Sequence, residues 1–366
     1  MKEFNTTGIC YPYKHYMVNI DSRIEEIEKA VVKGEYITIN RGRQYGKTTT
    51  LYHLAEKLQE NYVVFSISFE RMGEAEFGTD DALAYNFLDK MRKMLRVAKN
   101  ANDYVRNSIK KVVEDNSEKS LIRFSFLDDF FTDLCDNSDK PIVLIIDEVD
   151  SASNYESFIK LLRLLREKYL IREQIPTFQS VILAGVYDIK NLKLKVRPDS
   201  DHQYNSPWNI AVAYTTDMSL PTDGIQQMLQ EYESDHHTGM DTAQMAQMIT
   251  DYTSGYPFFV SRVCQLIDKQ NFSWDKDGLQ NAVKIILTER CPLFTELFDL
   301  MDCHPALKKS IREILDGRYI SYNNYVDGLN IASTFNIITD ENGQAKISNK
   351  IFETRFKNFF EFEKRF

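Results

Sequence analysis

The chain has little that would tie it to a membrane, a secretory route or a disulfide framework. It contains no run of about 18 apolar residues, the length that a membrane-spanning helix needs. Its first residues, Met-Lys-Glu-Phe-Asn-Thr, show no apolar signal core. The five cysteines are odd in number, lie far apart and form no Cys-x-x-Cys pair, which argues against zinc or redox motifs. We therefore expect reduced thiols in a cytoplasmic protein that does not enter a membrane.

An excess of positive charge is also missing. The formal net charge is −9, so the molecule as a whole does not attract nucleic acid. Acidic and basic residues are nearly balanced from residue 291 to the end, which leaves no basic footprint there. A local basic patch could still bind nucleic acid.

What is present is a chain of 366 residues that is 43% hydrophobic and 27% charged, as in soluble globular proteins. This length predicts two or three domains. The order of patterns predicts an α/β domain over residues 1–217, a helical lid over 218–290 and a winged-helix-like domain over 291–366. The last assignment depends on two short apolar runs around Glu341-Asn-Gly, which predict a hairpin after helices.

Apolar, β-branched runs alternate with helical patterns in the first part of the chain, which predicts a parallel sheet. The run Pro141–Asp147 is apolar throughout, as in strands that are buried on both faces. The helical patterns cover residues 80–137 and about 155–172. The expected strands are residues 35–40, 62–69, 141–147, 180–185 and 209–215.

The segment Arg41–Thr48, Arg-Gly-Arg-Gln-Tyr-Gly-Lys-Thr, falls where the first strand must turn into a helix. Backbone N–H groups and a helix N-terminus face such a turn, and phosphate is their natural ligand. Gly46 lets the backbone approach phosphates, Lys47 reaches the β and γ phosphates, and the Thr48 hydroxyl ligates Mg²⁺. The residues expected to contact the nucleotide here are Gly42, Arg43, Gln44, Tyr45, Gly46, Lys47, Thr48 and Thr49.

One position departs from the G-x-x-x-x-G-K-[ST] pattern. The first glycine is replaced by Arg41, and the nearest glycine is displaced to Gly42. A Gly-Lys-Thr triplet alone is also compatible with an ordinary helix N-cap, but the flanking strand and helix favour a P-loop.

The second chemical signal is Asp147-Glu148, two carboxylates at the end of the apolar run 142–146. This is typical of a Walker B strand. Asp147 is expected to hold the hydration shell of Mg²⁺, and Glu148 to act as the general base toward the attacking water. A buried strand that ends in a solvated acidic turn is the alternative, which the preceding P-loop pattern makes less attractive.

Together these residues resemble the bacterial AAA-like ATPases related to the STAND class, in which the first glycine of the P-loop is often lost. The segment His15–Arg23 is similar to the stretch that in this family precedes the first strand and lies near the adenine, which implies a role for Tyr16. Gly255-Tyr256-Pro257 resembles the Gly-x-Pro element of STAND lids, which implies that Pro257 touches the base. A plain turn before a helix is the other interpretation of this triplet.

The resemblance implies a P-loop NTPase fold with ATP and Mg²⁺ as ligands, and a switch with slow ATP hydrolysis catalysed by Lys47 and Glu148. Relatives often continue into a PD-(D/E)XK nuclease-like module. Residues up to Phe366 contain none, so we expect either a free-standing form or a piece of a longer protein. The alternatives are an ATP-binding scaffold without hydrolysis and a DNA-linked ATPase subunit that works with a nuclease. A protein partner or self-association is expected.

Two functions have no clear residue. Tyr187 or Asp188, after the fourth strand, are the candidates for a γ-phosphate sensor. Arg163, Arg166 and Arg197 are candidates for an arginine finger, but solvated surface arginines are the favoured interpretation of all three.

Overall fold

The structure is a computed structural model that describes residues 2–186, 208–214, 217–323 and 325–363. The chain forms two compact units. The first unit comprises residues 1–20, 41–49 and 217–366, and the second comprises residues 21–40 and 50–216. Among the described residues, no helix combines the length and the apolar character that crossing a membrane requires.

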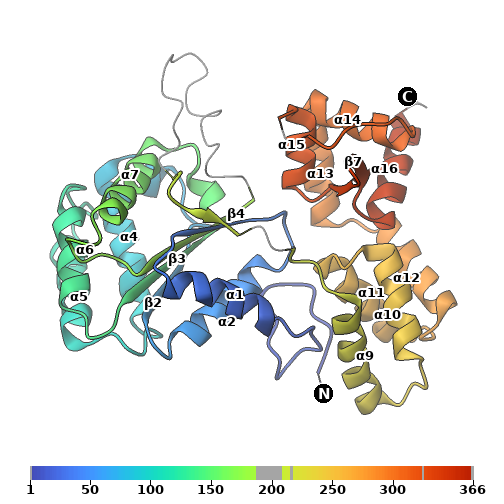
Figure 1. The fold of residues 1–366 in the computed structure, drawn as a ribbon, viewed down its shortest axis with the longest axis horizontal. Coiled ribbons are helices and arrows are strands. Elements are labelled where there is room, and N and C mark those ends of the chain that lie inside the picture. The colour runs from blue at the N-terminus through green and yellow to red at the C-terminus, as the bar shows by residue number, and fades with distance from the viewer. Residues whose placement is uncertain (1, 187–207, 215–216, 324, 364–366) are drawn as a thin grey trace. The chain divides into compact units, whose positions relative to one another are not determined.

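The second unit is built on a parallel sheet in the strand order β2-β3-β4-β1-β5 (Figure 1). All four pairs of neighbouring strands are parallel. Every residue of the central strands β3 and β4 is buried, which explains why their sequences are apolar without alternation. The strands are β1 (Ile37–Asn40), β2 (Val63–Ser68), β3 (Ile142–Asp147), β4 (Ser180–Gly185) and β5 (Val212–Ala213).

Helices cover this sheet. The apolar side chains of β2 and β3 that include Phe65 and Leu144 form one core with helices α4 to α7, while α1 and α2 lie on the other face (Figure 1). Side chains define the helix starts, since Thr79 accepts the Ala82 N–H and Asn102 accepts the Val105 N–H. The helices are α1 (Asp21–Val32), α2 (Lys47–Leu58), α3 (Glu74–Phe77), α4 (Asp80–Met94), α5 (Asp103–Asp115), α6 (Phe126–Asp136), the 3₁₀ helix η1 (Val149–Ala152) and α7 (Glu156–Leu170).

The C-terminal part of the first unit is mostly helical, and a β-hairpin connects its last two helices. In that hairpin, Asn342 and Gly343 both have positive φ, at 54° and 83°, as a two-residue turn of type I′ requires. Its elements are α9 (Thr222–His236), α10 (Thr242–Thr253), α11 (Pro257–Lys269), α12 (Lys276–Thr288), α13 (Pro292–Cys303), α14 (Pro305–Leu315), α15 (Asp327–Thr334), β6 (Ile338–Glu341), β7 (Gln344–Ile347) and α16 (Lys350–Glu363).

The N-terminal segment of the first unit packs on its helices. The ring of Phe4 lies 5.2 Å from that of Tyr16 and 5.1 Å from that of Tyr232 in α9. The Gln265 side chain in α11 donates a hydrogen bond to the Phe4 carbonyl at 3.0 Å. Residues 1–20 are therefore held by the helical part of the chain, although they precede the first strand in sequence.

The predicted α/β fold with a parallel sheet is confirmed, and so are the hairpin and the strands at 35–40, 62–69, 141–147 and 180–185 to within two residues at each end. The predicted strand at 209–215 is shorter, because only Val212–Ala213 pairs with β1, and residue 215 lies outside the described residues. The predicted domain boundaries at 217 and 290, and the winged-helix nature of the last part, stay predictions.

Candidate functional site

The P-loop turn, residues 41–48, follows β1 directly and leads into α2, which begins at Lys47. Gln44 and Gly46 have positive φ, at 56° and 82°. A Cβ added at Gly46 would meet no atom within 4 Å, so the space beside this glycine is open. The glycine is therefore required by its left-handed backbone, and the open space beside it suits a close ligand.

Lys47 is buried, with 5% of its surface exposed. Its ammonium group donates hydrogen bonds to the carbonyls of Arg41, at 2.8 Å, and Gly42, at 3.1 Å. The cation thus lies inside the turn that its own loop forms. A bound phosphate would replace these neutral carbonyl acceptors with anionic oxygens, which form stronger hydrogen bonds with the ammonium group. The charge and position of Lys47 fit a bound phosphate.

The displaced glycine, Gly42, is explained by a close approach of the segment after α15. A Cβ at Gly42 would lie 2.7 Å from the Phe335 carbonyl oxygen, a distance that real Cβ atoms do not tolerate. The Gly42 N–H also donates to the Asn336 side-chain oxygen at 3.0 Å. Gly42 therefore serves packing against residues 335–336 of the same unit, about 290 positions away in sequence.

The next residue of the turn is held by α11 and α13. The Tyr256 hydroxyl donates to the Arg43 carbonyl at 2.6 Å, and the Arg43 side chain pairs with Glu296 at 2.5 Å. The ring of Tyr256 meets the ring of Tyr45 edge to face, with centroids 4.8 Å apart. Burial raises the pKa of Tyr256 well above the usual range, so the hydroxyl stays a donor.

Three polar residues of the turn differ in their surroundings. Gln44 and Thr48 are exposed. Thr49 is half-buried, and its hydroxyl accepts the Cys10 N–H at 3.2 Å. This bond ties the N-terminal segment to the start of α2.

Tyr16 is almost fully buried, with 2% of its surface exposed. Its hydroxyl donates to Asp235 at 2.7 Å, and burial followed by this hydrogen bond raises its pKa. Its ring contacts Phe4, Tyr232 and His236. These contacts give Tyr16 a packing role, and a nucleotide contact by Tyr16 stays a prediction.

Pro257 is the first residue of α11 and is half-buried. The preceding Gly255 has φ +72°, and a Cβ there would lie 2.3 Å from the Leu220 carbonyl oxygen. The Leu220 N–H donates to the Gly255 carbonyl at 2.8 Å. The Gly-Tyr-Pro segment is therefore a tight junction between the start of α9 and α11, and its contact with a base stays a prediction.

The acidic end of β3 is the corresponding feature of the second unit. Asp147 is 6% exposed, and one of its carboxylate oxygens accepts the Glu148 N–H at 2.9 Å. Glu148 adopts a left-handed backbone conformation, with φ 55° and ψ 42°. Such a conformation costs a non-glycine residue about 1–3 kcal/mol and occurs at functional sites as well as in turns and helix caps.

A third carboxylate of the same stretch, Asp150, holds the end of the neighbouring strand. Its side chain accepts the Val186 N–H at 2.5 Å. A Cβ at Gly185 would lie 2.9 Å from the same oxygen, so a glycine is needed there. Sequence reasoning gave Asp150 no role, although its place three residues after Asp147 was a usable signal. We assign it as a positioning residue.

The ends of four strands share one edge of the sheet. Asn40, the last residue of β1, pairs with Gly185 of β4, and Asp147 of β3 pairs with Ser68 of β2. Arg41 follows Asn40 through one peptide bond. Ligands of open parallel sheets bind beyond this carboxyl edge.

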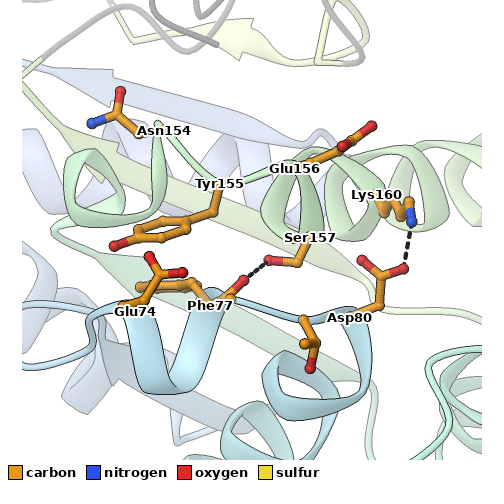
Figure 2. Close-up of a pocket in the computed structure, with 10 residues that line it drawn as sticks. Glu74, Phe77, Asp80, Asn154, Tyr155, Glu156, Ser157 and Lys160 are labelled. Atoms are coloured by element: carbon orange, nitrogen blue, oxygen red, sulfur yellow. Dashed lines mark hydrogen bonds and ion pairs between the residues drawn. The ribbon is translucent and has the colours of Figure 1, made fainter.

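Beyond Asp150, a cavity of about 650 Å³ separates the start of α7 from α3 and α4 (Figure 2). The Tyr155 ring stacks on Phe77 with centroids 5.0 Å apart, and Ser157 donates to the Phe77 carbonyl at 2.5 Å. Lys160 pairs with Asp80. None of the predicted site residues lines this cavity, and its contacts connect the segment after β3 to the helices that follow β2.

The weaker candidates do not gain a role. Arg163 is exposed and Arg166 half-buried on α7, and nothing described connects either to the site. Tyr187, Asp188 and Arg197 lie outside the described residues.

Comparison with known proteins gives a family and a fold. The family model described as an AAA-like domain matches residues 14–358. A Walker-type ATPase of Pyrococcus abyssi is similar in structure, with a TM-score of 0.62 and 15% identity over 97% of this chain and 99% of that one. The ORC2 protein of Aeropyrum pernix has a TM-score of 0.49 and 12% identity, over 99% and 98%. No curated protein matches the chain in sequence.

Proposed function

The chain belongs to the AAA-like domain family, and from this premise we propose that it binds ATP and hydrolyses it slowly, as a nucleotide-dependent switch of the STAND type. The observation that carries the proposal is the P-loop turn, in which the buried Lys47 ammonium is held by loop carbonyls beside the open, left-handed Gly46. A turn built around a buried cation is suited to an anionic ligand.

The residues of the turn have separate tasks in this proposal. The backbone N–H groups around Gly46 and the N-terminus of α2 bind the phosphates. Lys47 turns from its loop carbonyls to the terminal phosphates and neutralises charge there. Thr48, through its hydroxyl, and Asp147, through its carboxylate, are the residues that would hold Mg²⁺. The bound ion would neutralise phosphate charge and orient the terminal group.

Glu148 is the proposed general base. It orients the attacking water and accepts its proton as the water oxygen bonds to the γ-phosphorus, while the bond to the β–γ bridging oxygen breaks and ADP leaves. Its left-handed backbone fixes the direction in which the carboxylate leaves the end of β3. Asp150 supports this geometry through the Val186 N–H.

The switch part of the proposal depends on the contacts of the turn inside the first unit. Gly42 is bonded to Asn336, after α15, and Arg43 to Tyr256, before α11. Phosphate binding that rearranges the loop must change these contacts. By thermodynamic linkage, the factor by which nucleotide binding favours one arrangement of the C-terminal helices equals the factor by which that arrangement raises nucleotide affinity. This is the coupling that a switch needs.

The test of the switch is hydrogen–deuterium exchange on wild type and Asn336→Ala, each without nucleotide, with ADP and with a non-hydrolysable ATP analogue. The proposal predicts that the analogue changes exchange in α11 and α15 of the wild type, and that Asn336→Ala reduces the change in α15. The matched control is Asn330→Ala, on α15 but without a role in the turn. Equal exchange in all three states would leave a nucleotide-binding scaffold and no switch.

A further inference from the structure

The edge strand β2 presents unused backbone groups. It is the first strand in the sheet order, with β3 as its only strand neighbour among the described residues. The N–H groups of Val63 and Phe69 donate toward β3, to the carbonyls of Pro141 and Asp147, both at 3.0 Å. Because a strand alternates with a period of two, the N–H and C=O groups of Ser66 and Ser68 point to the outer edge. Such an edge is a template for another strand.

A groove of about 410 Å³ runs along this edge, between β2 and the end of α4. Its lining includes the apolar side chains of Ile67 and Met94 and the cations Arg71, Lys90 and Lys93. Lys93 is paired with Asp89 at 2.6 Å, whereas the described residues offer Arg71 and Lys90 no ion pair. Glu70, at the rim, is the only acidic residue in the lining. The groove is thus cationic in a protein whose net charge is −9.

The surroundings of Lys90 disfavour its charged form. Burial, followed by repulsion from Lys93, lowers its pKa, and Arg71 adds to the effect. Glu76 and Asp89 act in the opposite direction without cancelling it. An anion placed among these three cations would relieve their mutual repulsion.

We propose that this groove docks an extended acidic peptide segment of a partner protein, which adds to the sheet as a strand beside β2. The outward N–H and C=O groups of the half-buried Ser66 and the exposed Ser68 supply the pairing groups, as in other cases of strand addition. Alternate side chains of the added strand would reach the cations, so acidic residues at every second position are expected.

The alternative occupant, a nucleic-acid strand, fits less well. The lining of the groove includes the apolar Ile67 and Met94 and the carboxylate of Glu70. A continuous phosphate backbone would be repelled by Glu70 and would leave the outward N–H and C=O pairs of the strand only partly used. An acidic peptide can form ion pairs with the cations and backbone hydrogen bonds with the outward N–H and C=O groups of β2.

The experiment is fluorescence anisotropy on the full chain with a labelled peptide, Thr-Glu-Val-Glu-Val-Glu-Thr. We expect saturable binding, and no binding of the peptide in which glutamine replaces each glutamate. Lys90→Glu and Arg71→Glu should each weaken binding roughly tenfold or more, because like charges then face each other. The matched control is Lys111→Glu, an exposed lysine on α5 outside the groove, which should bind as the wild type does.

A second arm tests strand addition without altering the protein. Two peptides are compared, each with N-methyl groups on alternate residues. In one peptide the methyl groups block one edge of the extended backbone, and in the other peptide they block the opposite edge. Binding should be lost for the edge that pairs with β2 and kept for the other. Equal loss or equal retention would overturn strand addition, and unchanged binding by Lys90→Glu would overturn the groove as the site. A thymine oligonucleotide that displaces the peptide and itself depends on Lys90 would make this a nucleic-acid site instead.

Discussion

The P-loop turn and the acidic end of β3, the two elements that we propose for phosphate binding and catalysis, are held in opposite ways. The turn takes its contacts from far along the chain, from Tyr256 and Asn336. The end of β3 is held by Asp147 and Asp150 themselves, through N–H groups one and 36 residues away. The residues proposed for binding and those proposed for catalysis are therefore held by different parts of the sequence.

This difference indicates where regulation can act. A turn held by distant helices changes when those helices move, whereas a strand end fixed by its own carboxylates keeps its geometry. We infer that nucleotide affinity is the adjustable property of this chain and that the chemical step is the constant one. Four substitutions sharpen or break this comparison.

The largest effect is expected for Glu148→Gln. The amide keeps the shape of the side chain but cannot accept the proton, so turnover should fall by about 10² to 10⁴ with nucleotide affinity retained. Phosphate release under saturating ATP measures this. Glu156→Gln, on α7 beyond the strand end, is the control and should turn over normally. Wild-type turnover in Glu148→Gln would remove the general-base assignment.

Lys47→Ala should act on the other element. It removes the buried cation of the turn. Hydrogen bonds to charged groups contribute about 1.5–3 kcal/mol, so ATP affinity should fall roughly tenfold to a hundredfold. Calorimetric titration with ATP measures the change. Lys57→Ala, on the exposed side of the same helix, serves as control. Equal affinity in both variants would show that the turn is not the phosphate site.

Gly255→Ala tests the support of the turn by α11. The added Cβ would lie 2.3 Å from the Leu220 carbonyl at a φ of +72°. Overpacking and the left-handed backbone together should destabilise folding by roughly 2–4 kcal/mol. Gly239→Ala is the matched control, since its φ is +78° but its Cβ would meet nothing within 4 Å. Chemical denaturation should therefore separate the two variants, and equal losses would refute the packing argument.

The smallest effect is expected for Tyr256→Phe, which removes only the hydrogen bond to the Arg43 carbonyl. A net hydrogen bond is worth about 1 kcal/mol, so nucleotide affinity should shift about fivefold while turnover at saturation stays the same. Tyr252→Phe on α10 keeps that bond and should change neither. A shift in turnover alone would place Tyr256 with the chemistry of Glu148 and erase the distinction between the two elements.

Local patterns were enough to predict most of the second unit. The apolar run of β3 ends at Asp147 as expected, and Leu51, Leu54 and Leu58 of α2 are all buried. Strand burial and helix periodicity are set by neighbours in sequence, so a single chain reveals them. The same applies to the hairpin, whose Asn342-Gly343 turn is a short-range signal.

The environment of the P-loop turn could not be predicted in this way. Gly42 faces Phe335, and Tyr16 is enclosed by Phe4 and Tyr232. Gly42 and Phe335, like Tyr16 and Tyr232, are more than 200 residues apart in sequence, so these contacts result from tertiary packing. Asn336, the hydrogen-bond partner of Gly42, lies in a stretch whose sequence predicts only the start of a β-hairpin. Periodicity identifies a buried face but not the residue that meets it.

The central claim, that this chain binds and hydrolyses ATP through these two elements, is tested most directly by one combined measurement. ATP binding with Mg²⁺ is followed by calorimetry, and phosphate release is then measured on the same samples of wild type and Glu148→Gln. We predict binding by both proteins and release by the wild type alone. Absence of binding by the wild type would contradict the claim, and binding without release from either would leave only a nucleotide-binding scaffold.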